Sequence, residues 1–311
     1  MRLFAFLAFT TVAAVGMAAP TTANFETNQA ANFAVVIASP SNDASANFTY
    51  DSTTFVQANG TGTVPDITPS PGASTENVLR LNANFTPSDP NADVDGVGVY
   101  PNLVTPIGSM WSMQFDTWLN YNGPATGGSG STQMMFFGAT NSNTMALNTN
   151  TAVSIAGTGF YFTMTGDGGA SQDYRFYSGT GTIARNDAGA TWLGGAFYNN
   201  LDAVWIDATT GFFRDTLGYE TSGAPGKAWI TVKIVVNGTT CEVFVKRAGD
   251  AGFTSVATAT VPAGTTSPVI GFSDLNTGQP STIAWAADNF TLFDNLVIDN
   301  VAADVPDWHI Y

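Results

Sequence analysis

The chain has 311 residues, and its 24 acidic and 9 basic side chains give a formal net charge of -15. A surface of that sign repels phosphate backbones, which excludes nucleic acid as a partner, and no segment after the N-terminus has the apolar length of a membrane-spanning helix. Only 11 % of the residues are charged, and Asn, Thr, Ser and Gly supply the polarity instead, a composition typical of an extracellular β protein.

The N-terminus has the layout of a secretory signal peptide: one arginine, then an apolar run, then small residues. Cleavage after Ala19 and cleavage after Ala23 both fit this layout, and Pro20 directly after the first bond favours the second. We therefore predict a signal peptide over 1–23 and a secreted chain that forms a single domain over 24–311.

Apolar and polar residues alternate along most of the remaining chain, and Gly, Asn and Pro cluster between the alternating runs. This period of two predicts β-strands. The predicted strands are Asn32–Ile37, Asn77–Asn82, Gly96–Tyr100, Met110–Leu119, Gln133–Phe137, Gly159–Thr165, Asp173–Tyr177, Trp229–Val236, Thr240–Lys246, Val269–Phe272 and Leu292–Asp299. Many short strands separated by turns predict an all-β antiparallel sandwich or barrel.

The clearest pair of strands is WITVKIVVNGTTCEVFVKR, in which Asn237 and Gly238 open a short loop between two β-branched runs. The chain has one cysteine, Cys241, so it has no internal disulfide. The apolar pattern around Cys241 predicts a small buried side chain rather than a reactive thiol.

Several segments together resemble a known family: NFETNQAANFAVV, MWSMQFDTWLN, DYRFYSGTG, AWITVKIVVNGTTCEVFVK, VIGFSDL and FTLFDNLVID. Trp229 and Gly238 fit a W-x-x-V-x-I-x-V-x-G pattern, and residues 293–296 fit the F-D-N-[LV] of a last strand. The chain thus resembles the concanavalin A-like superfamily, in particular laminin G-like jelly rolls of exported bacterial proteins. The resemblance implies a jelly-roll sandwich in which the segment after Phe25 pairs with Leu292–Asp299.

The same superfamily includes glucanases, whose catalytic glutamates lie in an E-x-D-x-x-E run, and retaining glycosidases hold two carboxylates ~5 Å apart. That run is absent here, and the glutamates are isolated: Glu26, Glu76, Glu220 and Glu242. Asp202 and Asp207 could replace them, although capping of turns is the favoured role for these aspartates. His309, the only histidine, lies near a chain end, which is a poorly fixed place for a general base. Whether the chain is an enzyme stays open, with a non-catalytic role favoured.

A calcium site is predicted in SDPNADVDGVG, where Asp89, Asn91, Asp93 and Asp95 alternate and Gly96 follows. Alternating oxygens followed by glycine are typical of the start of a calcium loop. A polar turn before a strand is the equally weighted alternative, because the twelfth position of the loop lacks the glutamate of an EF-hand.

Asp173 and Arg175 are two residues apart, so both side chains project to one face of an extended segment. They form either an edge that binds sugar or a structural ion pair, which is worth only ~0–1 kcal/mol when exposed. The structural interpretation is favoured, because the proteins that the chain resembles share a DYR stretch whatever they bind.

Trp118 lies on the polar side of the strand MWSMQFDTWL, together with Gln114 and Asp116. An exposed indole there would offer a flat platform to a sugar ring, and its polar neighbours would bind hydroxyls. The favoured alternative is that the aromatic-rich loop 185–225 covers Trp118. That loop also contains Trp205, which could belong to a binding surface of its own.

The predicted function is therefore non-catalytic binding of extracellular polysaccharide or glycans, with calcium as a possible organiser of the site. The competing interpretation is a structural or adhesive surface protein that contacts other surface proteins and has no small ligand. A glycoside hydrolase that uses aspartates is a third, less favoured interpretation.

Overall fold

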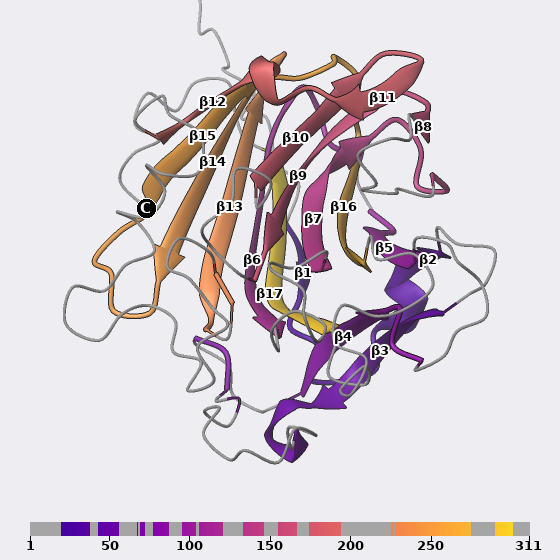
Figure 1. Ribbon diagram of the computed structural model, residues 1–311, viewed down its shortest axis with the longest axis vertical. Coiled ribbons are helices and arrows are strands. Elements are labelled where there is room, and N and C mark those ends of the chain that lie inside the picture. The colour runs from indigo at the N-terminus through magenta and orange to yellow at the C-terminus, as the bar shows by residue number, and fades with distance from the viewer. Residues whose placement is uncertain are drawn as a thin grey trace, which may run out of the picture.

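The computed structural model describes residues 20–37, 43–55, 67, 69–71, 77–86, 95–103, 106–120, 133–145, 155–166, 174–193, 225–226, 228–274 and 290–300. Within these residues, two antiparallel sheets face each other and form a β-sandwich (Figure 1). The predicted all-β sandwich, which the concanavalin A-like resemblance also implies, is confirmed. No described helix has the length and apolar character that crossing a lipid bilayer needs.

We call the two layers sheet A and sheet B. The strand order of sheet A is β12 (Ala190–Trp192), β15 (Thr254–Thr260), β14 (Thr240–Arg247), β13 (Ile230–Asn237), β6 (Met110–Asn120), β17 (Phe290–Asn300), β4 (Asn77–Ala83) and β3 (Ala44–Asp51), and β1 (Thr21–Ala23) also pairs with β17. The order of sheet B is β2 (Phe33–Ile37), β5 (Asp95–Pro101), β16 (Ser267–Asp274), β7 (Gln133–Thr140), β9 (Gly159–Thr165), β10 (Tyr174–Gly179), β11 (Thr182–Arg185) and β8 (Ile155–Ala156). Single turns of 3-10 helix lie at Ala30–Asn32, Ser52–Thr54 and Asp187–Gly189.

Every predicted strand is present, and the predicted hairpin between β13 and β14 is confirmed. Asn237 pairs with Thr240 across a two-residue loop, and Gly238 has a φ of 62°, a left-handed conformation that glycine adopts without strain. Two long strands, β3 and β15, were not predicted. Their sequences, ASANFTYD and TSVATAT, contain mostly small and hydroxyl side chains and therefore show little apolar alternation.

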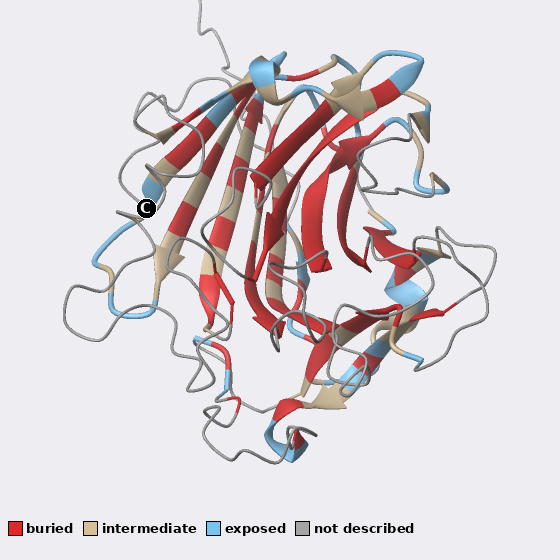
Figure 2. Ribbon diagram, in the orientation of Figure 1, coloured by how far each residue is buried: buried red, intermediate tan, exposed pale blue. Residues whose placement is uncertain are grey.

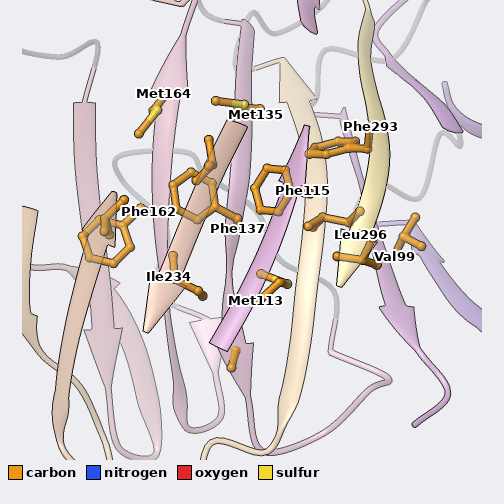
Figure 3. Packing of buried hydrophobic residues seen from close by; sticks show 14 of the residues in the cluster. Val99, Met113, Phe115, Met135, Phe137, Phe162, Met164, Ile234, Phe293 and Leu296 are labelled. Atoms are coloured by element: carbon orange, nitrogen blue, oxygen red, sulfur yellow. The ribbon is translucent and has the colours of Figure 1, made fainter. Parts of the chain in front are cut away.

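The main core fills the space between the two sheets. Alternation on β6 points Trp111, Met113 and Phe115 into this core, as predicted. Phe115 lies between Phe137 of sheet B and Phe293 of sheet A, with ring centroids 5.6 and 5.4 Å away (Figure 3). These edge-on aromatic contacts join the two layers at their centre.

Cys241 is buried in the same core, as its apolar surroundings predicted. Burial raises the pKa of its thiol well above the usual value, because a thiolate would lose its hydration there. The side chain therefore acts as a small apolar group and not as a nucleophile.

The pairing of the two ends of the fold differs from the prediction. The segment that pairs with the last strand lies before Phe25 and not after it: Thr21–Ala23 forms β1, and Ala23 lies opposite Leu296. After Phe25 the chain crosses to sheet B, where β2 pairs with β5. Phe25 itself is buried against Phe33 and Phe48, so it anchors the crossing in the core.

The two sheets differ in how their outer faces are covered. Strands β13 and β14 alternate between buried and half-buried residues, whereas β7 and β9 are buried along their whole length (Figure 2). The central strands of sheet B are therefore buried on both faces, and this contrast separates two candidate surfaces.

Candidate functional site

The predicted carbohydrate-binding residues do not form one site. Gln114, Asp116 and Trp118 lie on the outer face of sheet A, on β6. Arg175 lies on β10, and its register pairing with Thr163 and Phe136 places it on the outer face of sheet B. The sandwich core separates the two groups, so one ligand cannot contact both.

Trp118 has no open face that could receive a sugar ring, because its side chain is 3 % exposed. It packs against Trp229, with ring centroids 6.1 Å apart, and belongs to an apolar cluster outside sheet A. The other members of this cluster are Phe55, Ile67, Val78, Phe290 and Leu292. The favoured prediction that Trp118 is covered thus holds, but the covering side chains in the described structure come from other segments than 185–225.

Asp116 is also buried, and it serves a network of hydrogen bonds. It accepts a hydrogen bond of 2.5 Å from Thr231 Oγ1 and one of 2.8 Å from Asn295 Nδ2. Burial raises the pKa of Asp116, and these two bonds together with Lys246 partly offset that effect. The carboxylate is already engaged within the protein, which is the pattern of a structural group.

Asp294 faces Asp116 directly across β17 and β6. Burial, with smaller contributions from Asp116 and Glu26, raises the pKa of Asp294 to about 6, although Ser70 and the Asn295 backbone donate hydrogen bonds to it. Asn295 has a φ of 49° at the bulge of β17. The network therefore ties the segment around Ser70 onto sheet A and fixes the bulge.

Gln114 is the one residue of this group that is half-exposed. Its strand neighbours are Lys233 on β13 and Val297 on β17, so it lies on a mixed flat surface. Burial lowers the pKa of Lys233, since its ammonium group loses part of its hydration.

The outer face of sheet B carries a second apolar cluster, which is rich in tyrosine. Tyr161 and Tyr177 stack with ring centroids 4.6 Å apart and an angle of 9° between their planes. The Tyr100 hydroxyl donates a hydrogen bond of 2.6 Å to the Met145 carbonyl. Burial raises the pKa of all three phenols, so they remain neutral donors and acceptors at physiological pH.

Glycines shape the floor of this face. Gly98, Gly271 and Phe136 are paired in one row across β5, β16 and β7. A Cβ atom at Gly271 would lie 2.1 Å from Cζ of Phe136, so the phenyl ring lies over this glycine. The missing side chains leave room for an aromatic ring to lie along the sheet.

Two polar side chains continue the same row. Thr163 pairs with Phe136, and Arg175 pairs with Thr163. Arg175 is 5 % exposed and Thr163 is 0 % exposed. Among the described residues, the Thr163 hydroxyl is a buried group with no hydrogen-bond partner. Such a group costs free energy when left unsatisfied, and an unseen water, ion or ligand is the usual explanation.

Acidic groups gather at one end of sheet B. Asp95 at the start of β5 lies opposite Asp274 at the end of β16, and Asp274 lies opposite Gln133 at the start of β7. All three are buried on the core side of the sheet, where alternation places them with Val97 and Phe272. Two carboxylates on paired residues are oxygen donors of the kind that calcium prefers.

The chain enters β5 and β10 at this same end, because four antiparallel steps separate the two strands. At ~4.8 Å per step the strands lie about 19 Å apart. Of the residues in the two sequence predictions, Asp95 starts β5 and Arg175 lies near the start of β10. We call this end of sheet B, defined by Asp95, Asp274 and Gln133, the acidic end.

Several predicted residues lie outside the described part of the chain. They are Asp89, Asn91, Asp93, Asp173, Asp202, Trp205, Asp207 and His309. Among the described residues no group of three or more His, Cys, Asp or Glu side chains could hold a metal ion.

Sequence reasoning missed Asp274, Gln133 and Thr163. The signal for Asp274 was its place directly after the apolar run VIGFS, where an aspartate ends a buried strand. Thr163 lies within the apolar strand GFYFTMT, and nothing in that sequence distinguishes it from an ordinary β-branched strand residue.

A scan against protein-family models and a search of curated proteins found no match. The chain is similar to the solved structure of lectin II from Ulex europaeus, with 11 % identity, 92 % of this chain and 100 % of that chain covered, and a TM-score of 0.42. It is also similar to a protein of unknown function with a galectin-like fold from Bacillus subtilis (8 % identity, 91 % and 97 % covered, TM-score 0.41). The Ca2+/Man2-bound exoplasmic/lumenal domain of VIP36 gives 10 % identity, 75 % and 80 % coverage, and a TM-score of 0.39. Similarity at this level carries no conclusion about a ligand.

Proposed function

We propose that the protein is a secreted, non-catalytic carbohydrate-binding protein that contacts its glycan through the outer face of sheet B. The observation that carries the proposal is the buried Thr163 hydroxyl, which has no hydrogen-bond partner among the described residues and lies in one row with the Arg175 guanidinium group. Sugar hydroxyl groups form hydrogen bonds with such polar side chains.

The burial of this row indicates the shape of the site. Thr163 and Arg175 are almost closed off from solvent, unlike Gln114 on the other sheet. A ligand group that reaches them must therefore be small, such as the terminal sugar or a short branch of a glycan, rather than the side of a long chain. Our proposal therefore favours glycan ends as the ligand.

Calcium is the second part of the proposal, and it belongs at the acidic end. Calcium prefers carboxylate and carbonyl oxygens, six to eight in number. Asp95 and Asp274 supply two opposed carboxylates there, and the predicted ligands Asp89, Asn91 and Asp93 precede Asp95 in the chain. The ion would neutralise the two carboxylates and so hold the start of β5 beside the end of β16.

The test is a glycan-array screen with and without calcium, followed by calorimetric titration of the best ligand against variants. We expect Thr163→Val to weaken binding by up to about tenfold, because one neutral hydrogen bond contributes up to ~1.5 kcal/mol. The variant should keep its melting temperature, since valine has the same shape and leaves no unsatisfied hydroxyl.

Thr258→Val is the matched control, because Thr258 is an exposed strand residue of sheet A. It makes the same chemical change on the opposite layer and should leave the affinity unchanged. Equal loss of affinity in both variants, or no glycan bound by the parent protein, overturns the proposal. Release of reducing sugar by the parent protein would revive the hydrolase interpretation.

A further inference from the structure

The start of the fold, β1, argues against one of the cleavage sites that fit the sequence, the site after Ala23. Residues Thr21, Thr22 and Ala23 pair with Ile298, Val297 and Leu296 of the last strand. The Ala23 side chain is buried in the main core. Cleavage after Ala23 would remove this strand from the finished protein.

β1 has a structural task that no other described strand performs. β4 pairs with Phe290–Phe293 of β17, and β1 pairs with Leu296–Ile298 beyond the bulge. The two strands thus share one edge of β17, on either side of Asn295. Without β1, the backbone groups of Leu296–Ile298 on that edge lose their partners, and unpaired buried backbone groups are costly.

Cleavage after Ala23 would also start the mature chain directly before a core residue. Phe25 is fully buried, packs against Phe33 and Phe48, and has a φ of 53°. Its backbone N–H donates a hydrogen bond of 3.2 Å to Gln29 Oε1. A chain that began at Asn24, an exposed residue, would start one residue before this buried ring and would lack the strand that leads into it.

We infer that the signal peptidase cleaves upstream of β1, at the bond between Ala18 and Ala19. Enzymes of this class require small residues one and three positions before the bond, and Ala18 and Gly16 meet that requirement. Cleavage one residue later would place Met17 at the third position and Pro20 directly after the bond. The mature chain then begins Ala19-Pro20 and carries β1 intact. This inference rests on the secretion that forms part of the proposed function.

The experiment is to express the full chain in a secreting host and to determine the N-terminus of the exported protein by mass spectrometry. The expected first residue is Ala19. A matching variant, Ala18→Glu, should leave the uncleaved precursor in the cells, because the acidic side chain does not fit the small-residue position.

Each outcome is decisive. An exported protein that begins at Asn24, or any first residue other than Ala19, overturns the inference and leaves the secretion proposal intact. Normal processing of Ala18→Glu overturns it as well. A parent chain that is neither cleaved nor exported overturns the secretion proposal together with the inference, whereas glycan binding is measured separately.

Discussion

Asp95 and Asp274 lie directly opposite each other at the end of sheet B, and both are buried, with 1 % and 0 % of their surfaces exposed. The two carboxylates come from positions 179 residues apart in the chain and meet only because β5 pairs with β16. Like charges on paired residues repel each other, and a bound cation would relieve that repulsion. Their placement makes the calcium proposal testable without any glycan.

We predict that calcium raises the melting temperature of the parent protein and that Asp274→Asn abolishes the rise. In the presence of a chelator the variant should be more stable than the parent, because it removes one of two repelling charges. Differential scanning fluorimetry over a calcium series measures both effects, and the gain should grow with free calcium as mass action requires. Asp299→Asn is the control, because Asp299 lies half-buried on sheet A, and it should keep the full calcium response. A parent protein that is indifferent to calcium contradicts the prediction.

Trp118 is expected to act through packing. Trp118→Ala should lower the free energy of unfolding by about 3–5 kcal/mol, because it leaves a cavity beside Trp229 and Leu292. Gln114→Ala, on the same face of the same strand, should change it by no more than about 0.5 kcal/mol. Urea unfolding followed by tryptophan fluorescence measures the difference. Full stability combined with lost glycan binding in the Trp118 variant would instead support the exposed-platform interpretation.

The pKa of Asp294, raised to about 6, predicts how stability depends on pH. The folded protein binds this proton more tightly than the unfolded chain, in which the pKa is the ordinary 3.8. The contribution of Asp294 to the free energy of unfolding is therefore highest below pH 4. It is lost as the pH rises from about 4 to about 6, and it does not change further above pH 6.

Asp294→Asn should remove this dependence and should be the more stable protein at pH 7, because the neutral amide can accept the bond from the Asn295 N–H and donate one to the Ser70 hydroxyl, which then accepts instead of donating. Urea midpoints at pH 4.5, 5.5 and 7 for the parent and the variant measure it. A parent–variant difference that does not change with pH refutes the assignment.

The sequence predicts the two-layer sandwich correctly, but it does not predict which outward-facing side chains are exposed to solvent. Alternation in MWSMQFDTWLN correctly separated Phe115, which faces the core, from Trp118, which faces outward. Whether an outward side chain is exposed depends on remote residues, and for Trp118 these are Trp229 and Phe290. Local pattern carries no information about such neighbours.

In the candidate site, too, the sequence does not reveal which residues lie next to one another. The sequence identified Asp95 and Arg175 singly, but their partners Asp274 and Thr163 follow from the order of strands in sheet B. The sequence places Thr21–Ala23 in the signal peptide, because short runs of small residues occur both at the end of signal peptides and in short strands. Only its pairing with β17 reveals its place in the fold.

The turn between β13 and β14 gives the sharpest test of the local structure. A Cβ atom at Gly238 meets no other atom within 4 Å, yet its φ of 62° is a conformation that other residues adopt only with strain. Gly238→Ala should therefore lower the free energy of unfolding by ~1 kcal/mol. Gly252 also lies in open space but has no positive φ. Gly252→Ala should be neutral or stabilising by up to ~1 kcal/mol, because alanine restricts the unfolded chain. Both substitutions add one methyl group that touches no other atom. The difference between their urea midpoints therefore measures the cost of the left-handed conformation at residue 238. Equal midpoints would contradict that conformation.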